Sequence, residues 1–372
     1  MELYYTIFSF LLFSVVFERC STKAKHYVLF MWGVFFTLFG GLRWEIGGDW
    51  AQYHDHFLNS NWSNIFNYDR YGNGMDTLEP LFVFLNALVK SIFGTFYWYN
   101  ILCCAFIQYT YIYACKYYSP SRPLIMYIFI MLMGGSYFPV RAGLSIAICV
   151  WAYQMIKEKR LKAFLLIMFL AFNIHHASII FLPAYWLGKI KLKPINIYGI
   201  LLIFAVAGYV FQDFFTALSA MLGGDMGEKA LFYTMNQTEN YDDAKLSIVA
   251  ESLTFLFLWG YIKVRSLTRN QQEEYWINTL VNCFFIYNAI AYVFIYGMGD
   301  LTRLASYYFF AHAILFVTLL SRLKHYGKLF SILGYTFFIL YMGWQVTKIG
   351  NGFYFKAANI PYKTIFDYGN TK

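Results

Sequence analysis

Apolar runs long enough to cross a membrane recur along nearly the whole chain of 372 residues. They cover roughly residues 3–17, 26–42, 96–116, 122–138, 140–156, 195–211, 246–262, 276–296, 304–321 and 329–345. Only 13% of the residues are charged, whereas a soluble domain carries about 25%. Too little polar surface remains to cover a water-facing globule. The sequence therefore predicts an all-α polytopic membrane protein with about twelve transmembrane helices of about 20 residues each.

Charged residues are divided unequally between the connecting segments. Basic residues gather in six connectors, which hold Arg19/Lys23/Lys25, Lys116/Arg122, Lys157/Lys159/Arg160/Lys162, Lys189/Lys191/Lys193, Lys263/Arg265/Arg269 and Arg322/Lys324/Lys328. The two longest connectors, 43–80 and 212–245, each hold six acidic and two basic side chains. Because connectors rich in lysine and arginine stay in the cytoplasm, we expect one transmembrane domain over 1–345 with both acidic loops outside. The polar and aromatic tail, 346–372, is expected at the outer interface.

Two segments do not fit a simple span. The apolar run 163–187 is interrupted near its middle by Asn-Ile-His-His, which predicts a hairpin with its apex on the outer side. The run 79–93 is short and contains Asn86 and Lys90, so we expect a re-entrant or half-membrane helix. The alternative is a full span, which would place the basic residues of 157–162 outside, against the charge rule.

Ionisable residues near the outer ends of the predicted spans are expensive to place in a membrane, and each is a functional candidate. They are Arg43, Glu45, Asp49, Arg141, His175, His176, Asp213, Glu251, Asp300 and Arg303. Their convergence from several segments on one face indicates a site for an anionic, polar ligand. Simpler roles stay open. The long side chain of Arg141 could place its charged group at the membrane–water interface. Arg303 could pair with Asp300, and the histidines could be packing residues.

The sequence lacks the common motifs that bind phosphate groups or metal ions. Gly47-Gly48 and Gly223-Gly224 resemble turns, because no helix-opening glycine motif for phosphate accompanies them. No metal-binding spacing occurs, and the six cysteines fall mostly in apolar runs. The net charge of +9 is explained by the basic connectors and does not indicate a nucleic-acid partner. We therefore expect no metal and no cofactor.

A lipid-linked diphosphate would suit such a charged outer face. Arginine is always protonated and offers two parallel N–H donors to phosphate oxygens. Arginines from different helices could hold the diphosphate and offset the charge that develops as it departs. A histidine, or a carboxylate whose pKa burial has raised, could accept a proton from an attacking sugar hydroxyl.

At these residues the chain resembles the EpsG family of Wzy-type polysaccharide polymerases. The first similar element, Arg-x-x-x-Gly-x-Asp-Tyr-x-x-Tyr, matches GLRWEIGGDWAQYHDHF. Later elements, in the same order, are similar to EPLFVFLNALVKSIFG, FPVRAGLSIAICVWAYQMI, NIHHASIIFLPAYWL and DLTRLASYY. The resemblance covers about residues 1–325 and depends on the order of short motifs. Ala142 stands where the family often has glutamine, and Trp50 replaces the usual tyrosine.

The resemblance implies a bacterial inner-membrane enzyme, distantly like the O-antigen polymerases and ligases in architecture. Such an enzyme joins undecaprenyl-diphosphate-linked oligosaccharides, as donor and acceptor, into O-antigen, capsule or exopolysaccharide at the periplasmic face. A co-polymerase that sets chain length is an implied partner.

The same resemblance assigns roles to particular residues. The family's His-x-Ser matches His176-Ala177-Ser178, which makes His176 the expected base, with Glu45 or Asp49 as the alternative. The expected diphosphate ligands are Arg141 and Arg303, with Arg43 helping. Sugar contacts or loop contacts are expected from Tyr53, Asp300, Tyr307 and His175. Arg141→Ala is expected to slow the reaction with a much smaller effect on stability.

Two other classes remain as alternatives. A flippase or exporter of lipid-linked glycan would handle the same ligand, but transporters place paired charges near the bilayer midplane and often contain inverted repeats. This chain has no repeat, and its charges gather at one face. A membrane acyltransferase would explain a histidine within an apolar run but would leave the arginines without a role.

Overall fold

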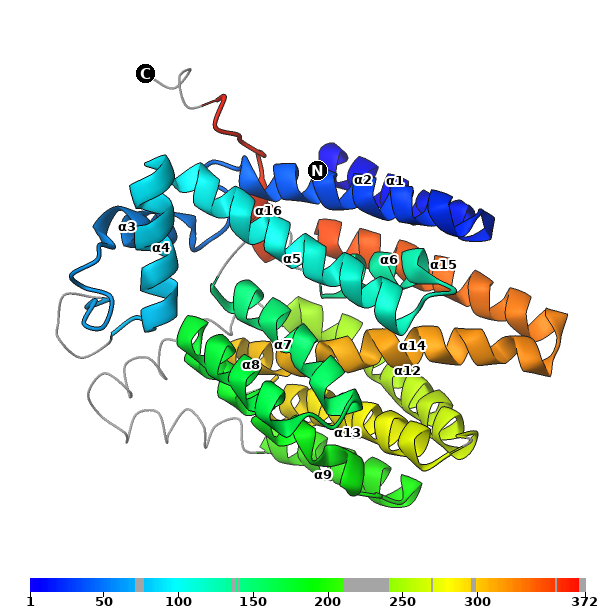
Figure 1. Cartoon of the computed structure of the whole chain (residues 1–372). Helices are drawn as coiled ribbons and strands as arrows, with labels where there is room; N and C mark the ends of the chain where they lie inside the picture. Colours follow the sequence, from blue (N-terminus) through cyan, green and yellow to red (C-terminus); the bar gives the residue numbers. More distant parts are fainter. Residues whose placement is uncertain are drawn as a thin grey trace. The chain divides into compact units, whose positions relative to one another are not determined.

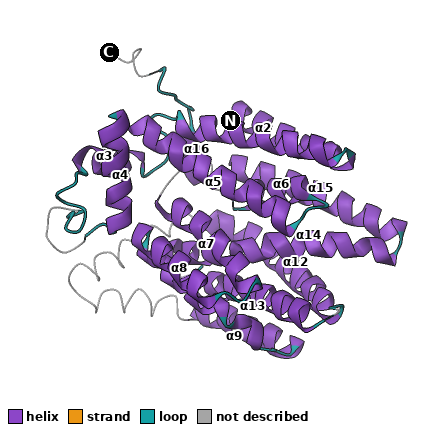
Figure 2. Cartoon of the chain, viewed as in Figure 1, coloured by secondary structure: helices purple, strands orange, loops and turns teal. Residues whose placement is uncertain are grey.

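The computed structural model describes residues 1–70, 77–134, 138, 141–210, 241–268, 270–295, 299–351 and 353–367, except for the side chains at 241–252, 299, 300, 350, 351, 353, 354 and 357. Every regular element within these ranges is a helix, as Figure 2 shows. The predicted all-α class is confirmed. The chain divides into two compact units, Met1–Ile179 with Leu323–Lys372, and Ile180–Arg322. The expectation of one transmembrane domain over 1–345 stays a prediction.

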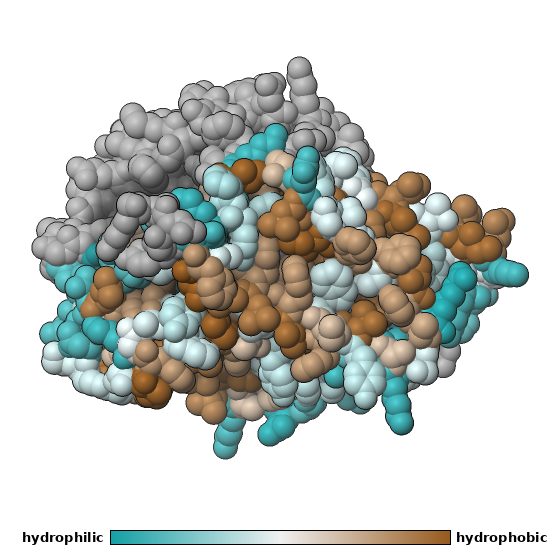
Figure 3. All heavy atoms as spheres, turned by 90° about the horizontal axis from the view of Figure 1, so that it is seen from above, coloured by the Kyte–Doolittle hydropathy of each residue, from teal (hydrophilic) through white to brown (hydrophobic). Residues whose placement is uncertain are grey.

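Several helices have the character of membrane spans. Within the described residues, three are long and apolar enough to cross a bilayer: Gln271–Phe294, Leu301–Tyr326 and Lys328–Ile349. Shorter apolar helices cover Pro80–Phe93, Pro123–Met133, Leu161–Ile174 and Pro194–Val210. Large apolar side chains such as Phe10, Phe30 and Leu340 are exposed, and Figure 3 shows apolar side chains over much of the displayed face. A lipid environment accounts for such a surface. The chain is a membrane protein, and its expected total of about twelve spans rests on the sequence pattern.

The first unit is built around α2 (Thr22–Gly41) and α5 (Phe96–Tyr118), which pack side by side (Figure 1). Gly41 permits this approach, because a Cβ at that position would lie 2.7 Å from the Cα of Ile101. The other helices of this unit are α1 (Glu2–Phe13), α3 (Trp50–Asn59), α4 (Pro80–Phe93), α6 (Pro123–Met133), α7 (Arg141–Lys157), α8 (Leu161–Ile174), α15 (Lys328–Asn351) and α16 (Phe353–Asn359). A 3₁₀ helix, η1 (Ser14–Arg19), follows α1.

Helix α4 is short and differs from α5 in direction. Its 14 residues extend about 21 Å at 1.5 Å per residue, which is shorter than the hydrocarbon core of about 30 Å. It runs across the direction of α5 instead of along it (Figure 1). Pro80 occupies the first turn of α4, and Gly94 ends it in the left-handed conformation with φ of 72°, the usual signals for a helix start and stop. The expected re-entrant or half-membrane placement of residues 79–93 stays a prediction.

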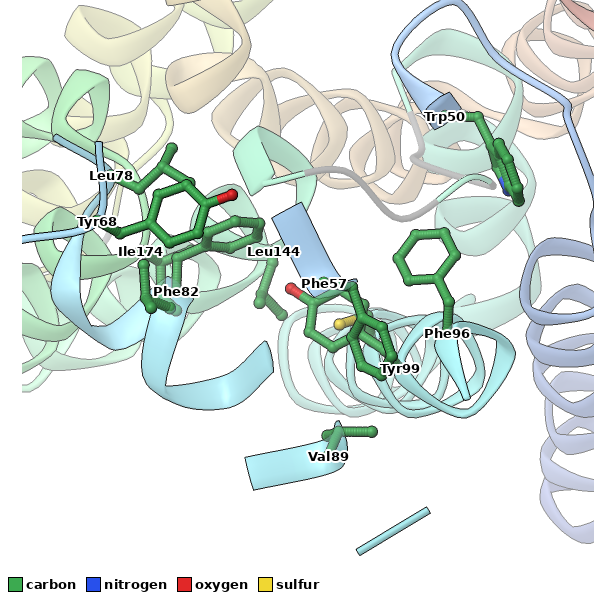
Figure 4. Close-up of a cluster of buried hydrophobic side chains, with 12 residues drawn as sticks. Trp50, Phe57, Tyr68, Leu78, Phe82, Val89, Phe96, Tyr99, Leu144 and Ile174 are labelled. Carbon is green, nitrogen blue, oxygen red and sulfur yellow. The ribbon is translucent and has the colours of Figure 1, made fainter. Parts of the chain in front are cut away.

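The connector before α4 is folded and packs on a hydrophobic core (Figure 4). Trp50 and Phe57 of α3 contribute to this core, and they meet side chains from α4, α5, α7 and α8. The segment then closes on itself, because the N–H of Leu78 donates to the carbonyl of Tyr68 at 3.0 Å. Lys90 of α4 donates to the carbonyls of Leu58 and Ser60 and so fastens the end of α3. The core thus holds the start of α4 in a fixed place.

We expect Phe57→Ala to destabilise this unit by about 3–5 kcal/mol, because a fully buried phenylalanine leaves a cavity when it is truncated. The ring of Phe57 packs 5.5 Å from that of Phe96 and 6.1 Å from that of Tyr99. The thermal midpoint of the purified protein measures the effect. The matched control is Leu58→Ala, since Leu58 is exposed. Equal midpoints for the two variants would contradict the core described above.

The second unit contains η3 (Leu187–Lys189), α9 (Pro194–Val210), α12 (Tyr241–Ser266), α13 (Gln271–Phe294), η4 (Gly299–Tyr308) and most of α14 (Phe309–Leu323). Two buried amides of α13 organise it. Asn278 donates to the carbonyls of Gly188 and Ile190, and Asn282 donates to those of Leu187 and Ile190. The carbonyl of Leu187 also accepts the N–H of Ile190 at 3.1 Å, whereas the carbonyls of Gly188 and Ile190 lie at the end of the short 3₁₀ segment, where carbonyls lack helical partners. Most of the predicted loop 212–245 lies outside the described residues.

The C-terminal segment packs against the start of the chain. Helix α15 continues to Asn351, beyond the expected end of the last span at residue 345. After it, the N–H of Trp44 donates to the carbonyl of Lys363 at 3.0 Å, and the N–H of Ile365 donates to that of Leu42 at 2.9 Å. The ring of Tyr362 stacks on Phe39, with centroids 4.5 Å apart. The tail is therefore part of the first unit.

Candidate active site

Four polar groups meet at the buried carboxylate of Glu79, which is only 3% exposed. Nη1 of Arg141 lies 2.6 Å from Oε2 of Glu79. Nδ1 of His175 lies 3.1 Å from Oε1, and the backbone N–H of His176 donates to the same oxygen at 2.9 Å. The ring of His176 is farther away, with Nδ1 at 3.9 Å from Oε1. We call Glu79, Arg141, His175 and His176 the Glu79 cluster.

Helix termini bring these residues together. Glu79 is the N-cap of α4, and Arg141 is the first residue of α7. His175 is the C-cap of α8, where the helix ends and the 3₁₀ helix η2 (His176–Tyr185) begins. The predicted interruption of the run 163–187 is therefore confirmed at the histidines. A carboxylate is favoured at a helix N-terminus, where unpaired N–H groups carry partial positive charge. The same partial charge disfavours a cation at the start of α7. The negative charge of Glu79 offsets this cost for Arg141.

The surroundings keep Glu79 ionised. Burial raises its pKa, but the His175 ring, the charge of Arg141 and the His176 N–H outweigh that effect and lower the pKa to about 2. An ionised carboxylate only accepts hydrogen bonds, so Nδ1 of His175 must carry the proton that lies between them. Nε2 of His175 is then the unprotonated nitrogen when the ring is neutral. A carboxylate with such a low pKa is a poor base near neutral pH, and Glu79 is better suited to orient the groups around it.

The two histidine side chains differ in their exposure to solvent. The His175 side chain is 23% exposed, and the His176 side chain is 53% exposed. His176 packs its ring near Phe172, with centroids 4.6 Å apart. Arg141 is 10% exposed at its side chain and lies over the ring of Phe82, 5.9 Å from the centroid. Its Nε is buried and makes no hydrogen bond to any described residue. The arginine therefore has donor capacity beyond its bond to Glu79.

Arg43 is placed in a second buried position of the same unit. It is 2% exposed, and its guanidinium lies 4.9 Å from the centroid of the Phe138 ring. Burial lowers the pKa of Arg43 to about 10, while Cys104, Tyr362, Tyr53 and Asp49 act in the opposite direction. Arg43 is thus still cationic at neutral pH, and the C-terminal segment covers it through the pairing of Arg43 with Thr364.

The other expected residues of the first acidic loop have different environments. Glu45 is exposed and pairs with Lys363 of the tail at 3.2 Å. Asp49 is exposed at the N-cap of α3, with no side-chain capping bond. Tyr53 packs against Phe82, with ring centroids 6.0 Å apart. Burial raises the pKa of the Tyr53 phenol, and the charge and the backbone N–H of Arg141 oppose that increase. Tyr53 therefore adjoins the Glu79 cluster, whereas Glu45 and Asp49 make no described contact with it.

The remaining candidates belong to the second unit. Arg303 and Tyr307 lie on η4, where Arg303 is exposed and Tyr307 is buried. Asp213 lies outside the described residues, and so do the side chains of Asp300 and Glu251. Within the described part of the chain, no group of three or more His, Cys, Asp or Glu side chains is arranged to hold a metal ion.

Glu79 is the residue that the sequence reasoning missed. It was counted only as one of six acidic side chains of the loop 43–80. A local signal was available: Glu79 comes directly before Pro80 and an apolar helix, and a carboxylate is favoured electrostatically at such a helix N-terminus. No pattern in the sequence alone shows that Arg141, 62 positions later, reaches the same carboxylate.

Fold and site together define a helical membrane protein with a buried, charged cluster formed at helix termini. The family model for the EpsG family matches residues 26–364, nearly the whole chain. The chain therefore belongs to the EpsG family, a Wzy-type polymerase-like family associated with polysaccharide biosynthesis. No curated protein matches the chain, and no solved structure matches it.

Proposed function

We propose that this protein polymerises undecaprenyl-diphosphate-linked oligosaccharide repeat units at the periplasmic face of the bacterial inner membrane. The observation that carries the proposal is the Glu79 cluster, a buried carboxylate that holds an arginine and a histidine in one place. The membership of the chain in the EpsG family supports a polymerase-like role. We further propose that the chain crosses the membrane about twelve times and that the product is O-antigen, capsule or exopolysaccharide.

The proposed reaction is a glycosyl transfer without a metal. A hydroxyl of one repeat unit attacks the anomeric carbon of the sugar that is attached to the diphosphate of the other. The new C–O bond forms as the anomeric carbon–oxygen bond to diphosphate breaks, and undecaprenyl diphosphate leaves with that electron pair. The hydroxyl proton passes to the unprotonated Nε2 of a histidine. Arginine N–H donors offset the charge that develops on the leaving diphosphate.

Residue roles follow from the geometry of the cluster. Arg141 is the proposed diphosphate ligand. Arg43 and Arg303 lie outside the cluster, and their proposed role as further cations rests on the sequence alone. Glu79 is a positioning residue, because it fixes the Arg141 guanidinium and the proton on His175 Nδ1. This arrangement favours His175 as the base, whereas the family resemblance favours His176. Glu45 and Asp49 are less suited to the role of base, because they are exposed to solvent.

Single variants of the two histidines separate these assignments. We expect His175→Gln to reduce the polymerisation rate by about 10²–10⁴-fold, the usual contribution of a general base. His176→Gln should reduce it less than tenfold, because the bond from His176 to Glu79 comes from the backbone N–H and survives the substitution. Initial rates on synthetic repeat units give the comparison. The reverse order of effects would make His176 the base.

The function is tested by incubating the purified protein with synthetic undecaprenyl-diphosphate repeat units in the presence of EDTA. The expected product is a ladder spaced by one repeat, read on a gel or by mass spectrometry. Folded protein that makes no ladder from the correct repeat unit would refute the polymerase. Transport of the same lipid-linked unit across proteoliposomes would then support the flippase or exporter class instead.

A further inference from the structure

A polar pocket of about 390 Å³ lies in the folded connector before α4, apart from the Glu79 cluster. Its walls come from α3 and from the segment that follows α3. Seven of its lining side chains carry amide, carboxylate or guanidinium groups: Gln52, Asp55, Asn59, Asn64, Asn67, Asp69 and Arg70. Sites for small molecules have volumes of about 300–1,000 Å³, so the pocket is large enough for a ligand.

A buried histidine of the pocket has an unused ring nitrogen. His56 lines the pocket and is 4% exposed. Its Nδ1 lies 3.2 Å from the hydroxyl oxygen of Tyr68, while its Nε2 makes no hydrogen bond to any described residue. Burial and the charges of Arg70 and Arg141 lower the pKa of His56 to about 4, so the ring is neutral at pH 7. The histidine therefore adds no positive charge to the wall of the pocket.

The chemistry of the lining indicates the ligand class. Amides both donate and accept hydrogen bonds, and carboxylates accept them, so together they match a ligand with many hydroxyl groups. A diphosphate is disfavoured, because Asp55 and Asp69 oppose an anion and Arg70 is the only lysine or arginine among the lining residues. An apolar ligand would displace water from these polar groups without offering hydrogen bonds in return, at a cost in free energy. The pocket therefore fits an uncharged, hydroxyl-rich molecule.

The backbone connects the pocket directly to Glu79. Tyr68 lines the pocket, and its carbonyl accepts the N–H of Leu78, the residue before Glu79. Asp69 pairs with Thr77 in the same antiparallel arrangement. An occupant of the pocket is thus held on the segment that carries the central carboxylate of the cluster.

We propose that this pocket is a saccharide-binding subsite, which holds sugars of one lipid-linked repeat unit while the Glu79 cluster acts on the diphosphate end of a unit. The second half of this statement rests on the proposed function. The first half, sugar binding in the pocket, does not depend on any reaction.

Direct binding tests the subsite. The probe is the free repeat-unit oligosaccharide, released by mild acid from the lipid-linked unit of the cells that express the protein. Its affinity for the full-length protein in nanodiscs is measured by calorimetry or ligand-observed NMR. The variants are Asp55→Asn and Asn67→Ala, whose exposed side chains make no hydrogen bond to any described residue, so that the fold is spared. The control is Ser63→Ala, an exposed hydroxyl of the same segment outside the pocket.

We expect wild-type protein to bind the oligosaccharide and each pocket variant to bind it about 5–20-fold more weakly, the effect of one lost hydrogen bond to a polar ligand. Ser63→Ala should bind it as the wild type does. Folded wild-type protein that does not bind the oligosaccharide would overturn the subsite, and so would pocket variants with wild-type affinity.

A polymerisation assay on the same preparations distinguishes the two proposals. If a ladder forms while the pocket variants bind as the wild type does, the subsite is wrong and the polymerase stands. If no ladder forms while the pocket variants lose sugar binding, the subsite stands and the polymerase is wrong. If both stand, the pocket variants should raise KM for the lipid-linked unit about 5–20-fold with a smaller change in kcat.

Discussion

Glu79→Gln should nearly abolish polymer formation, with a loss of about 10²–10⁴-fold in rate. An amide in place of the carboxylate removes the counter-charge of Arg141 and no longer specifies which nitrogen of His175 carries the proton. The size of the effect is estimated by analogy with carboxylate-to-amide changes beside a catalytic histidine. Rates on synthetic repeat units give the result, with Glu158→Gln as the matched control. Glu158 is an exposed glutamate at the end of α7 that pairs with Arg160.

The pH dependence of stability gives a second test of the role of the Glu79 carboxylate. Its pKa is lowered from the ordinary 4.5 to about 2, so the unfolded chain binds the proton more readily than the folded one. The stabilisation from ionised Glu79 is therefore complete above about pH 5 and is lost as the pH falls from there toward 2. The thermal midpoints of the wild type and Glu79→Gln should differ by a constant amount from pH 8 to 5 and converge below that. A constant difference down to pH 3 would contradict the assigned ion pair.

Arg141→Ala should lower the rate by about 10²–10³-fold, as expected for the loss of a donor that stabilises charge in the transition state. The sequence alone led us to expect little loss of stability. The structure changes that expectation, because Arg141 neutralises a carboxylate that is 3% exposed. Removal of one partner from a buried ion pair typically costs about 3–5 kcal/mol. The variant should therefore also show a lower thermal midpoint.

A double variant separates the catalytic effect from the structural one. Glu79→Gln combined with Arg141→Ala removes both buried charges, so stability should recover most of the loss seen in Arg141→Ala alone. Activity should not recover, because the diphosphate still lacks its ligand. Recovered activity in the double variant would show that Arg141 acts only through the fold. A single Arg141→Ala variant with wild-type polymer length and wild-type abundance would exclude both roles.

Two features of the site could be predicted from local sequence, namely the end of α8 and the short length of the run before Gly94. The break between Ile174 and His175 follows from polar residues within an apolar run, and the structure ends α8 there. The short run before Gly94 has the length of a half-membrane helix, because too few residues are available to cross the bilayer. Such features depend on neighbours in the chain, and each can be recognised from a window of about 20 residues.

Contacts between distant segments could not be predicted in this way. Arg43 was expected to bind diphosphate, and the structure places it under the C-terminal segment, against Phe138 and beside Tyr362. These partners come from segments whose positions depend on how helices pack.

The sequence by itself determined the class of this protein, because the scarcity of charge and the length of the apolar runs leave only a helical membrane protein. It also determined which side chains are costly in a membrane, and therefore where function was to be sought. Only the tertiary structure decided that Glu79 is the centre that joins Arg141 to the histidines. The physical reason is that a buried carboxylate obtains its partners from three helix termini, and the packing of those helices is set by contacts that lie far apart in the chain.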